Sequence, residues 1–431
     1  MKDMQQKFLS VNERALYVTI ALLPFSPFLV TLFGTALNNI IVLSIWKEAV
    51  ICFVFCLLVM YGFKQQKNSM HHLMHDPLVA VIFVYMCYMV MDMLVRGVTL
   101  DQLAGFVINS RFLLAFLAGC LLVRFYEKTS VKALNKLILS CSFVVMGIGL
   151  LIFFLPNNLL ELVGYDPIGI DRVGVPGSVY YVSDGLRIER IQSTMRSPNS
   201  VGLYLLIPLA LLLFNTIKLK SSTRKVLIGL CIIVIIMTFS RTALLGVFVV
   251  VAGYLFYTVR KFDKKKLAGN VTASLLAVAV LVVAAFSDPS FRELALHQTA
   301  TQINGSTNVR LESYGKIANA VVASPFGYGG GSASAAGRLR PQGAIAVPEN
   351  YYLQIMYEYG FVGFTLFIAI LIFSIKKLMS DKTDQDRALL VSFLALLACS
   401  LFLPAWAEEA VSITWWYLFG LVAMRNIPVM R

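Results

Sequence analysis

Arginines ahead of an apolar segment form the first group of residues whose types and spacing could do chemistry. Arg187, Arg190 and Arg196 precede the run Ser197-Pro198-Asn199, after which the sequence turns apolar. Proline suits the first turn of a helix, and a helix N-terminus with arginines beside it suits an anion such as a phosphate. The alternative is that these arginines only mark the boundary of a membrane.

Two further arginines lie within or between strongly apolar segments. Arg241 separates two short apolar segments in the run Thr238-Phe239-Ser240-Arg241-Thr242, and Arg111 lies part of the way into another. An ionised side chain at membrane depth costs about 2.5 to 3.5 kcal/mol, so both are candidates for a functional site. Arg111 could instead be paired inside the protein, for example with Asp92.

A third group lies in the polar stretch that ends near residue 352. It contains an amphipathic segment with Arg310 in its first turn and Thr307 or Asn308 as its cap. The apolar positions that share one face of this predicted helix are Leu311, Tyr314, Ala318 and Val321. The glycine-rich run at 325–331 is interpreted as a flexible loop, or alternatively as backbone that approaches a ligand closely.

Acidic residues close this third group. Glu349 precedes Asn350, Tyr351 and Tyr352 at the start of an apolar segment, and its carboxylate could accept a proton as a general base. Alternatively, Glu349 has a structural role, in a salt bridge or beside a helix N-cap. Glu408 and Glu409, ahead of the last apolar segment, are alternative acids or boundary charges.

Composition identifies the elements that must position these residues. Of 431 residues, 58% are hydrophobic and only 14% are charged, whereas soluble domains carry about 25% charged residues. With a mean hydropathy of +0.76, the chain is predicted to be an all-α polytopic membrane protein, a single transmembrane domain over 1–431. About twelve spans are expected: 15–34, 40–62, 77–95, 103–123, 136–156, 199–216, 226–239, 242–259, 268–286, 353–375, 388–405 and 411–424.

The net charge of +14 is explained by topology rather than by nucleic-acid binding. Most basic residues fall into short loops on one side, which predicts that both termini and these loops are cytoplasmic. The first apolar run is expected to be a signal anchor. Two long connections, 157–198 and 287–352, then fall on the outer side of the membrane and are expected to carry short helices.

Other chemistries find little support. The cytoplasmic loops lack a glycine-rich phosphate motif. The seven cysteines lie in or beside apolar segments and form no disulfide or zinc pattern. His71, His72 and His75 are interpreted as part of a solvated loop rather than a weak metal site. No cofactor or metal is therefore expected.

Taken together, these pieces resemble the O-antigen ligase and Wzy-type polymerase superfamily of bacterial inner-membrane glycosyltransferases. The resemblance covers most of residues 100–424, and it rests on the order of its motifs. These are the arginine-rich segment ending in Ser197-Pro198-Asn199, Ser240-Arg241 between short spans, Arg310, the Pro-x-Gly-x-Gly at 325–329, Asn350-Tyr351-Tyr352-Leu353 and the Glu-x-Gly-x-x-Gly at 358–363. It implies about twelve helices, a GT-C-like architecture and an undecaprenyl-diphosphate-linked oligosaccharide donor used at the periplasmic face.

The resemblance also implies roles for the candidate residues. Arg241 and Arg310 are expected to bind the departing diphosphate, and Glu349 to act as base or to orient the acceptor. Additional substrate contacts are expected from Arg190, Arg196, Asn199, Arg111, Asn350 and Tyr352.

The choice between family activities depends on one position. Family ligases carry a histidine where this chain has Glu349, so an O-antigen or exopolysaccharide polymerase is favoured over a ligase. Expected partners are the donor, a glycan or lipid-linked acceptor, the lipid bilayer and a chain-length regulator. A lipid-linked glycan transporter is the alternative from another class.

Overall fold

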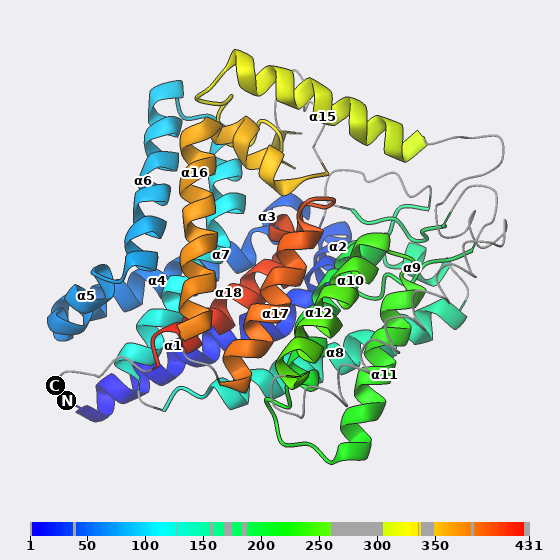
Figure 1. The fold of residues 1–431 in the computed structure, drawn as a ribbon, viewed down its shortest axis with the longest axis horizontal. Coiled ribbons are helices and arrows are strands. Elements are labelled where there is room, and N and C mark those ends of the chain that lie inside the picture. The colour runs from blue at the N-terminus through cyan, green and yellow to red at the C-terminus, as the bar shows by residue number, and fades with distance from the viewer. Residues whose placement is uncertain are drawn as a thin grey trace.

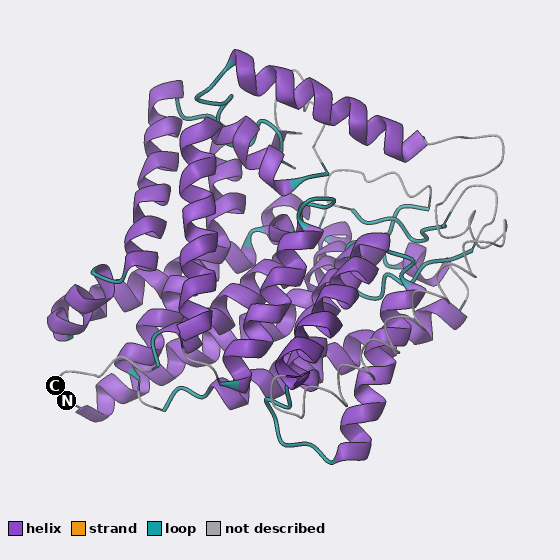
Figure 2. Ribbon diagram, in the orientation of Figure 1, coloured by secondary structure: helices purple, strands orange, loops and turns teal. Residues whose placement is uncertain are grey.

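The computed structural model describes residues 2–37, 40–126, 128–155, 158–167, 175–182, 188–259, 305–334, 336–337, 349–380 and 383–425. Within these ranges the protein is a bundle of helices without a β-strand (Figures 1 and 2). Only two isolated β-bridges occur there, Asp166 with Gly177 and Tyr181 with Glu189. The predicted all-α fold is confirmed for this part of the chain.

Each predicted span except 268–286, which lies outside the described residues, coincides with a helix or a pair of helices. The elements are α1 (Lys2–Leu22), η1 (Leu23–Phe25), α2 (Ser26–Ala36), α3 (Ile40–Ser44), α4 (Trp46–Gln65), α6 (Pro77–Arg96), α7 (Leu100–Phe125), α8 (Val131–Phe154), α10 (Pro198–Leu213), α11 (Ser221–Met237), α12 (Arg241–Val259), α16 (Tyr351–Ser380), α17 (Asp384–Cys399) and α18 (Glu409–Ala423).

Fewer of these helices than expected have the length of a membrane span. Among the described residues, seven helical segments are long and apolar enough to cross a membrane, and α10 and α18 are shorter apolar helices. With 16 and 15 residues, they are about 22 to 24 Å long at 1.5 Å per residue. A bilayer core is about 30 Å thick, so length alone does not make them spans, and the expected count of twelve is not confirmed.

The short helix α18 lies at the centre of the bundle, packed against α7 (Figure 1). Every residue from Ala410 to Ala423 is buried. A Cβ on Gly420 would lie 2.2 Å from the carbonyl oxygen of Phe116, so glycine allows the two backbones to approach. Because protein surrounds α18 on all sides, its length is set by its neighbours rather than by the bilayer.

Aromatic side chains fill the space between α7, α17 and α18. The rings of Phe393 and Trp415 stack at 4.4 Å, and Trp416 meets Phe112 at 5.4 Å and Phe116 at 5.8 Å. Aromatic rings dominate core packing because each buries a large apolar area. This cluster fixes how the three helices lie relative to one another.

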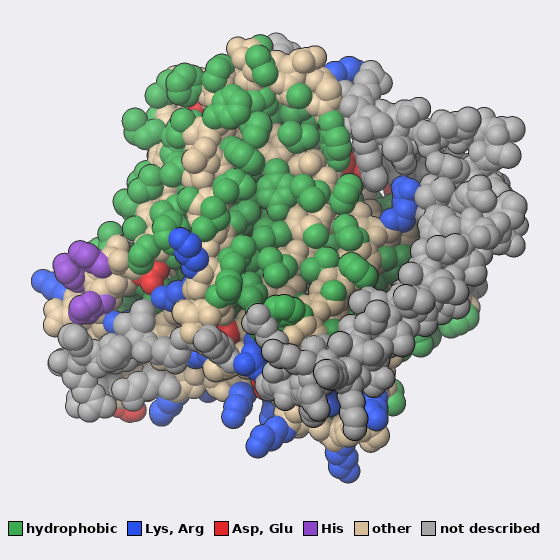
Figure 3. All heavy atoms as spheres, viewed as in Figure 1, with side chains coloured by type: hydrophobic (Ala, Val, Ile, Leu, Met, Phe, Trp, Pro, Cys, Tyr) green, Lys and Arg blue, Asp and Glu red, His purple; other side chains and the backbone are tan. Residues whose placement is uncertain are grey.

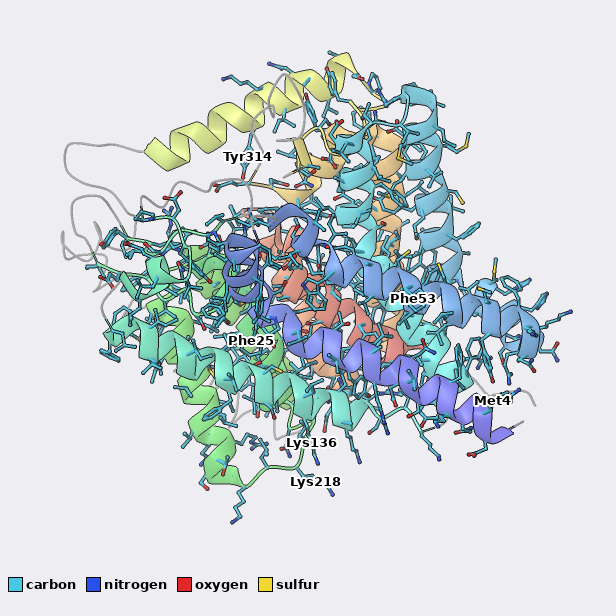
Figure 4. All side chains as sticks on the ribbon, turned by 180° about the vertical axis from the view of Figure 1, so that it is seen from behind. Met4, Phe25, Phe53, Lys136, Lys218 and Tyr314 are labelled. Atoms are coloured by element: carbon cyan, nitrogen blue, oxygen red, sulfur yellow. The ribbon has the colours of Figure 1, made fainter. Side chains whose placement is uncertain are left out.

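Two opposite ends of the bundle differ in charge and in structure. Figure 4 places Lys136 and Lys218 at one end and Tyr314 at the other. Lysine and arginine side chains gather along the first of these ends, the lower edge of the view, below a largely apolar surface (Figure 3). We call it the basic end; its assignment to the cytoplasm stays a prediction.

Helix α15 (Gly305–Ala323) lies across the opposite end of the bundle (Figure 1). It contains the predicted amphipathic segment, but the buried face differs from the one expected. Ile317 and Val321 are buried and Tyr314 is half-buried, whereas Ala318 is exposed. The expected face was therefore wrong at Ala318. The buried face of α15 is rotated by about one residue relative to the predicted face.

Two further short helices lie in connections. One is α9 (Asn158–Leu162), within the first long connection. The other is α5 (Lys67–Met74), which carries His71 and His72 with His75 as its C-cap. The expected solvated loop is thus a helix, with Met70 and Leu73 buried against the bundle.

Candidate functional site

Several candidate residues converge where α10, α12, α16 and α18 begin and α17 ends. The thiol of Cys399, the last residue of α17, donates to the carbonyl oxygen of Thr242 at 3.1 Å. The amide of Tyr351 donates to the carbonyl of Ser400 at 2.9 Å. The turn after α17 therefore contacts both the start of α12, where Arg241 lies, and the start of α16, which Glu349 precedes.

Tyr314 of α15 meets the same turn from outside the bundle. Its hydroxyl lies 3.3 Å from the carbonyl oxygen of Glu349 and 3.4 Å from that of Leu401. Arg310 lies in α15 four residues before Tyr314, a spacing at which residues are neighbours on a helix; its side chain lies outside the described residues. The turn at 399–401 thus links three segments that are far apart in sequence.

Arg190 ties the first long connection to this region. Its Nε donates to the carbonyl of Thr238 at 2.8 Å, and one terminal nitrogen donates to Asn199 Oδ1 at 2.9 Å. The pKa of Arg190 is lowered to about 10, mainly by burial and also by the nearby positive charge of Arg241, while Tyr180 opposes this change. Two guanidinium groups are therefore close enough to repel each other, a cost that a bound anion would relieve.

Two helix N-termini lie beside these arginines. Ser197 Oγ accepts from the amide of Ser200 at the start of α10, and Ser240 Oγ accepts from the amide of Ala243 at the start of α12, both at 3.3 Å. A Cβ on Gly202 would lie 2.5 Å from the Cβ of Ala243, so the two starts are in contact. Amide groups and helix dipoles at such ends favour negative charge.

The turn between α11 and α12 is tight. Phe239 has a φ of 46°, in the left-handed region. A bulky residue rarely adopts this conformation, and strained residues of this kind cluster at functional sites. The strain is compensated locally, because the amides of Thr238 and Phe239 donate to carbonyls of the last turn of α11.

Arg196 lies near an acid, Glu408. The carboxyl group of Glu408 hydrogen-bonds the side chain of Ser200 and faces Arg196. Burial raises the pKa of Glu408, and the hydrogen bond and Arg196 oppose that rise. Arg196 and Glu408 thus join the first long connection to the residue that precedes α18.

Arg111 belongs to a buried network of four charged side chains. Its NH1 lies 2.6 Å from Glu48 Oε1 and 3.6 Å from Glu409 Oε2. Lys47 Nζ lies 2.8 Å from Glu409 and 3.4 Å from Glu48. Arg111 also donates to the carbonyl of Ala407. Two cations and two carboxylates therefore balance each other at the start of α18.

The expected partner of Arg111 was wrong. Asp92 pairs with Arg96 of its own helix at 2.7 Å, because residues four apart in a helix are neighbours. A role for Arg111 in substrate binding stays a prediction, and the structure gives its guanidinium partners within the protein.

Asn350 and Tyr352, also expected to contact substrate, hold the start of α16 in place. Asn350 Oδ1 accepts from the amide of Leu353 at 3.0 Å, which is an N-cap. The hydroxyl of Tyr352 donates to the carbonyl of Leu397 at 2.9 Å. Both side chains therefore position the segment that carries the half-buried Glu349.

Glu358 is a buried acid for which the sequence predicted no role. It is fully buried. Its Oε2 accepts from Asn109 Nδ2 at 2.6 Å, and its Oε1 accepts from the amides of Ala333 and Ser334 at 3.1 and 2.8 Å. An ionisable residue inside an apolar segment was the available signal. Glu358 anchors residues 333–334, directly after the glycine-rich run, to α7 and α16.

The glycine-rich run is packed against the bundle rather than loose. Gly331 has a φ of 80°, and a Cβ there would lie 2.2 Å from the carbonyl oxygen of Asp101. At Gly360, with φ 64° and ψ −165°, a Cβ would lie 2.2 Å from the carbonyl oxygen of Pro325. Such backbone is essentially confined to glycine. The interpretation of residues 325–331 as a flexible loop was therefore wrong.

Comparison with known families assigns this region. Residues 226–368 match the model of the Wzy_C family, which is described as O-antigen ligase. The matched segment contains Arg241, Arg310, Glu349 and Glu358. None of the curated proteins compared with the chain matches it.

The apolar helices are those expected of a membrane protein. The match over residues 226–368 supports the O-antigen ligase and Wzy superfamily that the resemblance predicted. Members of this family are ligases and polymerases of the membrane glycosyltransferase kind, and the match supports such a function for this chain. Among the described residues no group of three or more His, Cys, Asp or Glu could hold a metal ion.

Proposed function

We propose that the protein polymerises glycan repeat units, taking them from an undecaprenyl-diphosphate-linked donor at the periplasmic face of the inner membrane. The observation that carries the proposal is one juxtaposition. Arg190, Arg241 and two helix N-termini favour an anion, and the turn at 399–401 links them to the segment that carries Glu349.

The cationic side of this region suits the leaving group. When the bond between the anomeric carbon and the diphosphate oxygen breaks, its electron pair stays on the diphosphate. Fixed cations and amide dipoles stabilise the charge that develops there. Arg241 and Arg190, with the N-termini of α10 and α12, supply such groups without further rearrangement. Arg310 is assigned to the same anion from its place in α15.

The acidic side suits the acceptor. An acceptor hydroxyl attacks the anomeric carbon as the diphosphate leaves, and Glu349 takes the proton of that hydroxyl or orients it. A general base of this kind contributes about 10² to 10⁴ in rate. Tyr314 fixes the backbone of Glu349 from α15, which brings the acid and the segment of Arg310 into one unit.

Arg196 and Arg111 are assigned a different role from the other arginines. Each faces carboxylates of the protein, Glu408 for Arg196 and Glu48 and Glu409 for Arg111. We therefore treat them as positioning residues for the start of α18.

Purified protein in nanodiscs, given only donor lipid carrying one repeat unit, tests the proposal. A ladder of longer lipid-linked glycans together with released undecaprenyl diphosphate is expected. Arg241→Ala and Glu349→Gln should each slow ladder formation at least 100-fold, while the exposed Arg14→Ala and Glu161→Gln leave it unchanged. Wild-type ladders from Arg241→Ala and Glu349→Gln would overturn the assignment of the site.

A ligase is the second candidate, since the matched family is described as O-antigen ligase. A ligase would be silent with donor alone and active once a separate lipid acceptor is added. Transfer of intact donor across the nanodisc without cleavage would instead indicate a transporter.

A further inference from the structure

A cleft of about 230 Å³ opens between the start of α6 and the last turns of α16. A single buried water needs about 10 to 15 Å³, so the cleft has room for a much larger group. It is far from the turn at 399–401 along α16, whose first residues lie at that turn. Its lining residues are Asp76, Pro77, Leu78, Phe373, Lys376, Lys377 and Ser380.

The charges in this cleft leave a surplus positive charge. Lys377 Nζ and Asp76 Oδ2 form an ion pair at 2.7 Å. The other oxygen of Asp76 caps α6 by accepting from the amides of Leu78 and Val79 at 3.0 and 3.4 Å. Asp76 is thus fully engaged, and the exposed ammonium of Lys376 remains as the net charge of the cleft.

The ring of Phe373 holds that ammonium at the cleft. Lys376 Nζ lies 5.4 Å from the ring centroid, a distance typical of a cation–π contact. Phe373 and Leu78 also give the cleft apolar walls. A group with a negative head and an apolar tail would match both properties of this cleft.

The surroundings place the cleft where a lipid head group would lie. Both α6 and α16 are long and apolar enough to cross a membrane, and each exposes large apolar side chains on its outer face, Met91 on α6 and Met379 on α16 among them. Lysine, acidic and histidine side chains gather on the same flank, beside the lower ends of these helices (Figure 3). Helix α5, which begins with Lys67, ends at Met74, two residues before Asp76.

We propose that this cleft binds one anionic phospholipid of the leaflet that meets the basic end. The phosphate lies at Lys376, and an acyl chain follows the apolar outer faces of α6 and α16. Basic pockets between transmembrane helices recognise anionic head groups in this way. The inference stands apart from the glycan chemistry, because none of the residues in the cleft belongs to that site.

Lipid retention tests this site directly. The full-length protein is released from nanodiscs of equal parts phosphatidylglycerol and phosphatidylcholine, and its retained lipids are counted by native mass spectrometry. The wild type should retain phosphatidylglycerol preferentially. Lys376→Gln should weaken this retention about fivefold, the effect of one lysine charge near a membrane surface, and Lys376→Arg should preserve it.

Lys136→Gln and Lys218→Gln are matched controls, because both lysines are exposed at the basic end and lie outside the cleft. They should retain phosphatidylglycerol as the wild type does. Equal losses in Lys376→Gln and in the two controls would show attraction by the whole basic end and overturn the site. Equal retention of both lipids by the wild type would overturn it as well. Unchanged melting temperatures in detergent establish that the variants are folded.

Discussion

Arg111 and Glu48 are 63 residues apart in the sequence and form an ion pair of 2.6 Å at the centre of the bundle's buried charge network. The two side chains are 8% and 11% exposed. Lys47 and Glu409 complete the network, so α4, α7 and α18 are joined by charges rather than by apolar packing alone.

Glu48→Gln should destabilise the protein by about 3 kcal/mol, because removing one partner of a buried pair leaves the other charge uncompensated. Unfolding in detergent measures the change. The double variant Glu48→Gln with Arg111→Met should lose less stability than the sum of its single variants. Asp384→Asn, in an exposed pair with Arg387 at 2.8 Å, is the control and should cost under about 1 kcal/mol. Equal effects of Asp384→Asn and Glu48→Gln would contradict this account.

Gly360→Ala should lower the melting temperature and abolish glycan transfer together. The added Cβ would meet the carbonyl oxygen of Pro325, and the backbone conformation there is strained for any other residue, at about 1 to 3 kcal/mol. Gly229→Ala in α11 is the matched control, since a Cβ there meets nothing within 4 Å. It should stabilise the helix by up to about 1 kcal/mol. If the melting temperature fell in Gly229→Ala but not in Gly360→Ala, the packing described for the glycine-rich run would be refuted.

Glu358→Met should release residues 333–334 from α16. Methionine has no oxygen to accept from the backbone amides of Ala333 and Ser334, and a buried donor left without an acceptor costs about 1 to 3 kcal/mol. Hydrogen exchange at these two amides should become roughly thirtyfold faster, for a loss of about 2 kcal/mol. The amide of Ala243, bonded to Ser240, is the internal reference. Unchanged exchange at Ala333 and Ser334 would show that Glu358 is not their anchor.

Glu408→Gln should flatten the dependence of stability on pH. Burial raises the folded-state pKa of Glu408 above the ordinary value of 4.5, so the fold favours its protonated form. Its contribution to stability is present below pH 4.5 and declines as pH rises through the raised pKa. Melting temperatures from pH 4 to 8 should therefore decline less for Glu408→Gln than for the wild type. Glu161→Gln is the control. If the melting temperature of Glu408→Gln followed pH in parallel with that of the wild type, a contribution of Glu408 to the pH dependence would be excluded.

The local pattern of the chain was sufficient to predict most helices. Apolar runs of spanning length identify α6, α7 and α8, and the Ser197-Pro198 signal marks the start of α10 where the structure has it. These features depend on residues within a few positions of each other, so the helical period and capping chemistry determine them. The order of the short motifs likewise predicted the superfamily that the match over residues 226–368 supports.

Partners across the fold could not be predicted in this way. An arginine inside an apolar segment requires a buried counter-charge on energetic grounds. From the sequence alone, both Asp92 and Glu48 were acceptable partners for Arg111. Only the packing of α4, α7 and α18 decided between them, because Asp92 was already paired with Arg96. The role of Glu358 likewise depended on a loop more than twenty residues away.

The sequence by itself determined that this is a helical membrane protein, where most of its helices begin, and which arginines and acids are candidates for chemistry. The tertiary structure decided which of those charges balance each other within the protein and which converge at the turn at 399–401. The physical reason is that helix formation is a local property, whereas pairing of charges in a low-dielectric interior depends on which helices are brought into contact.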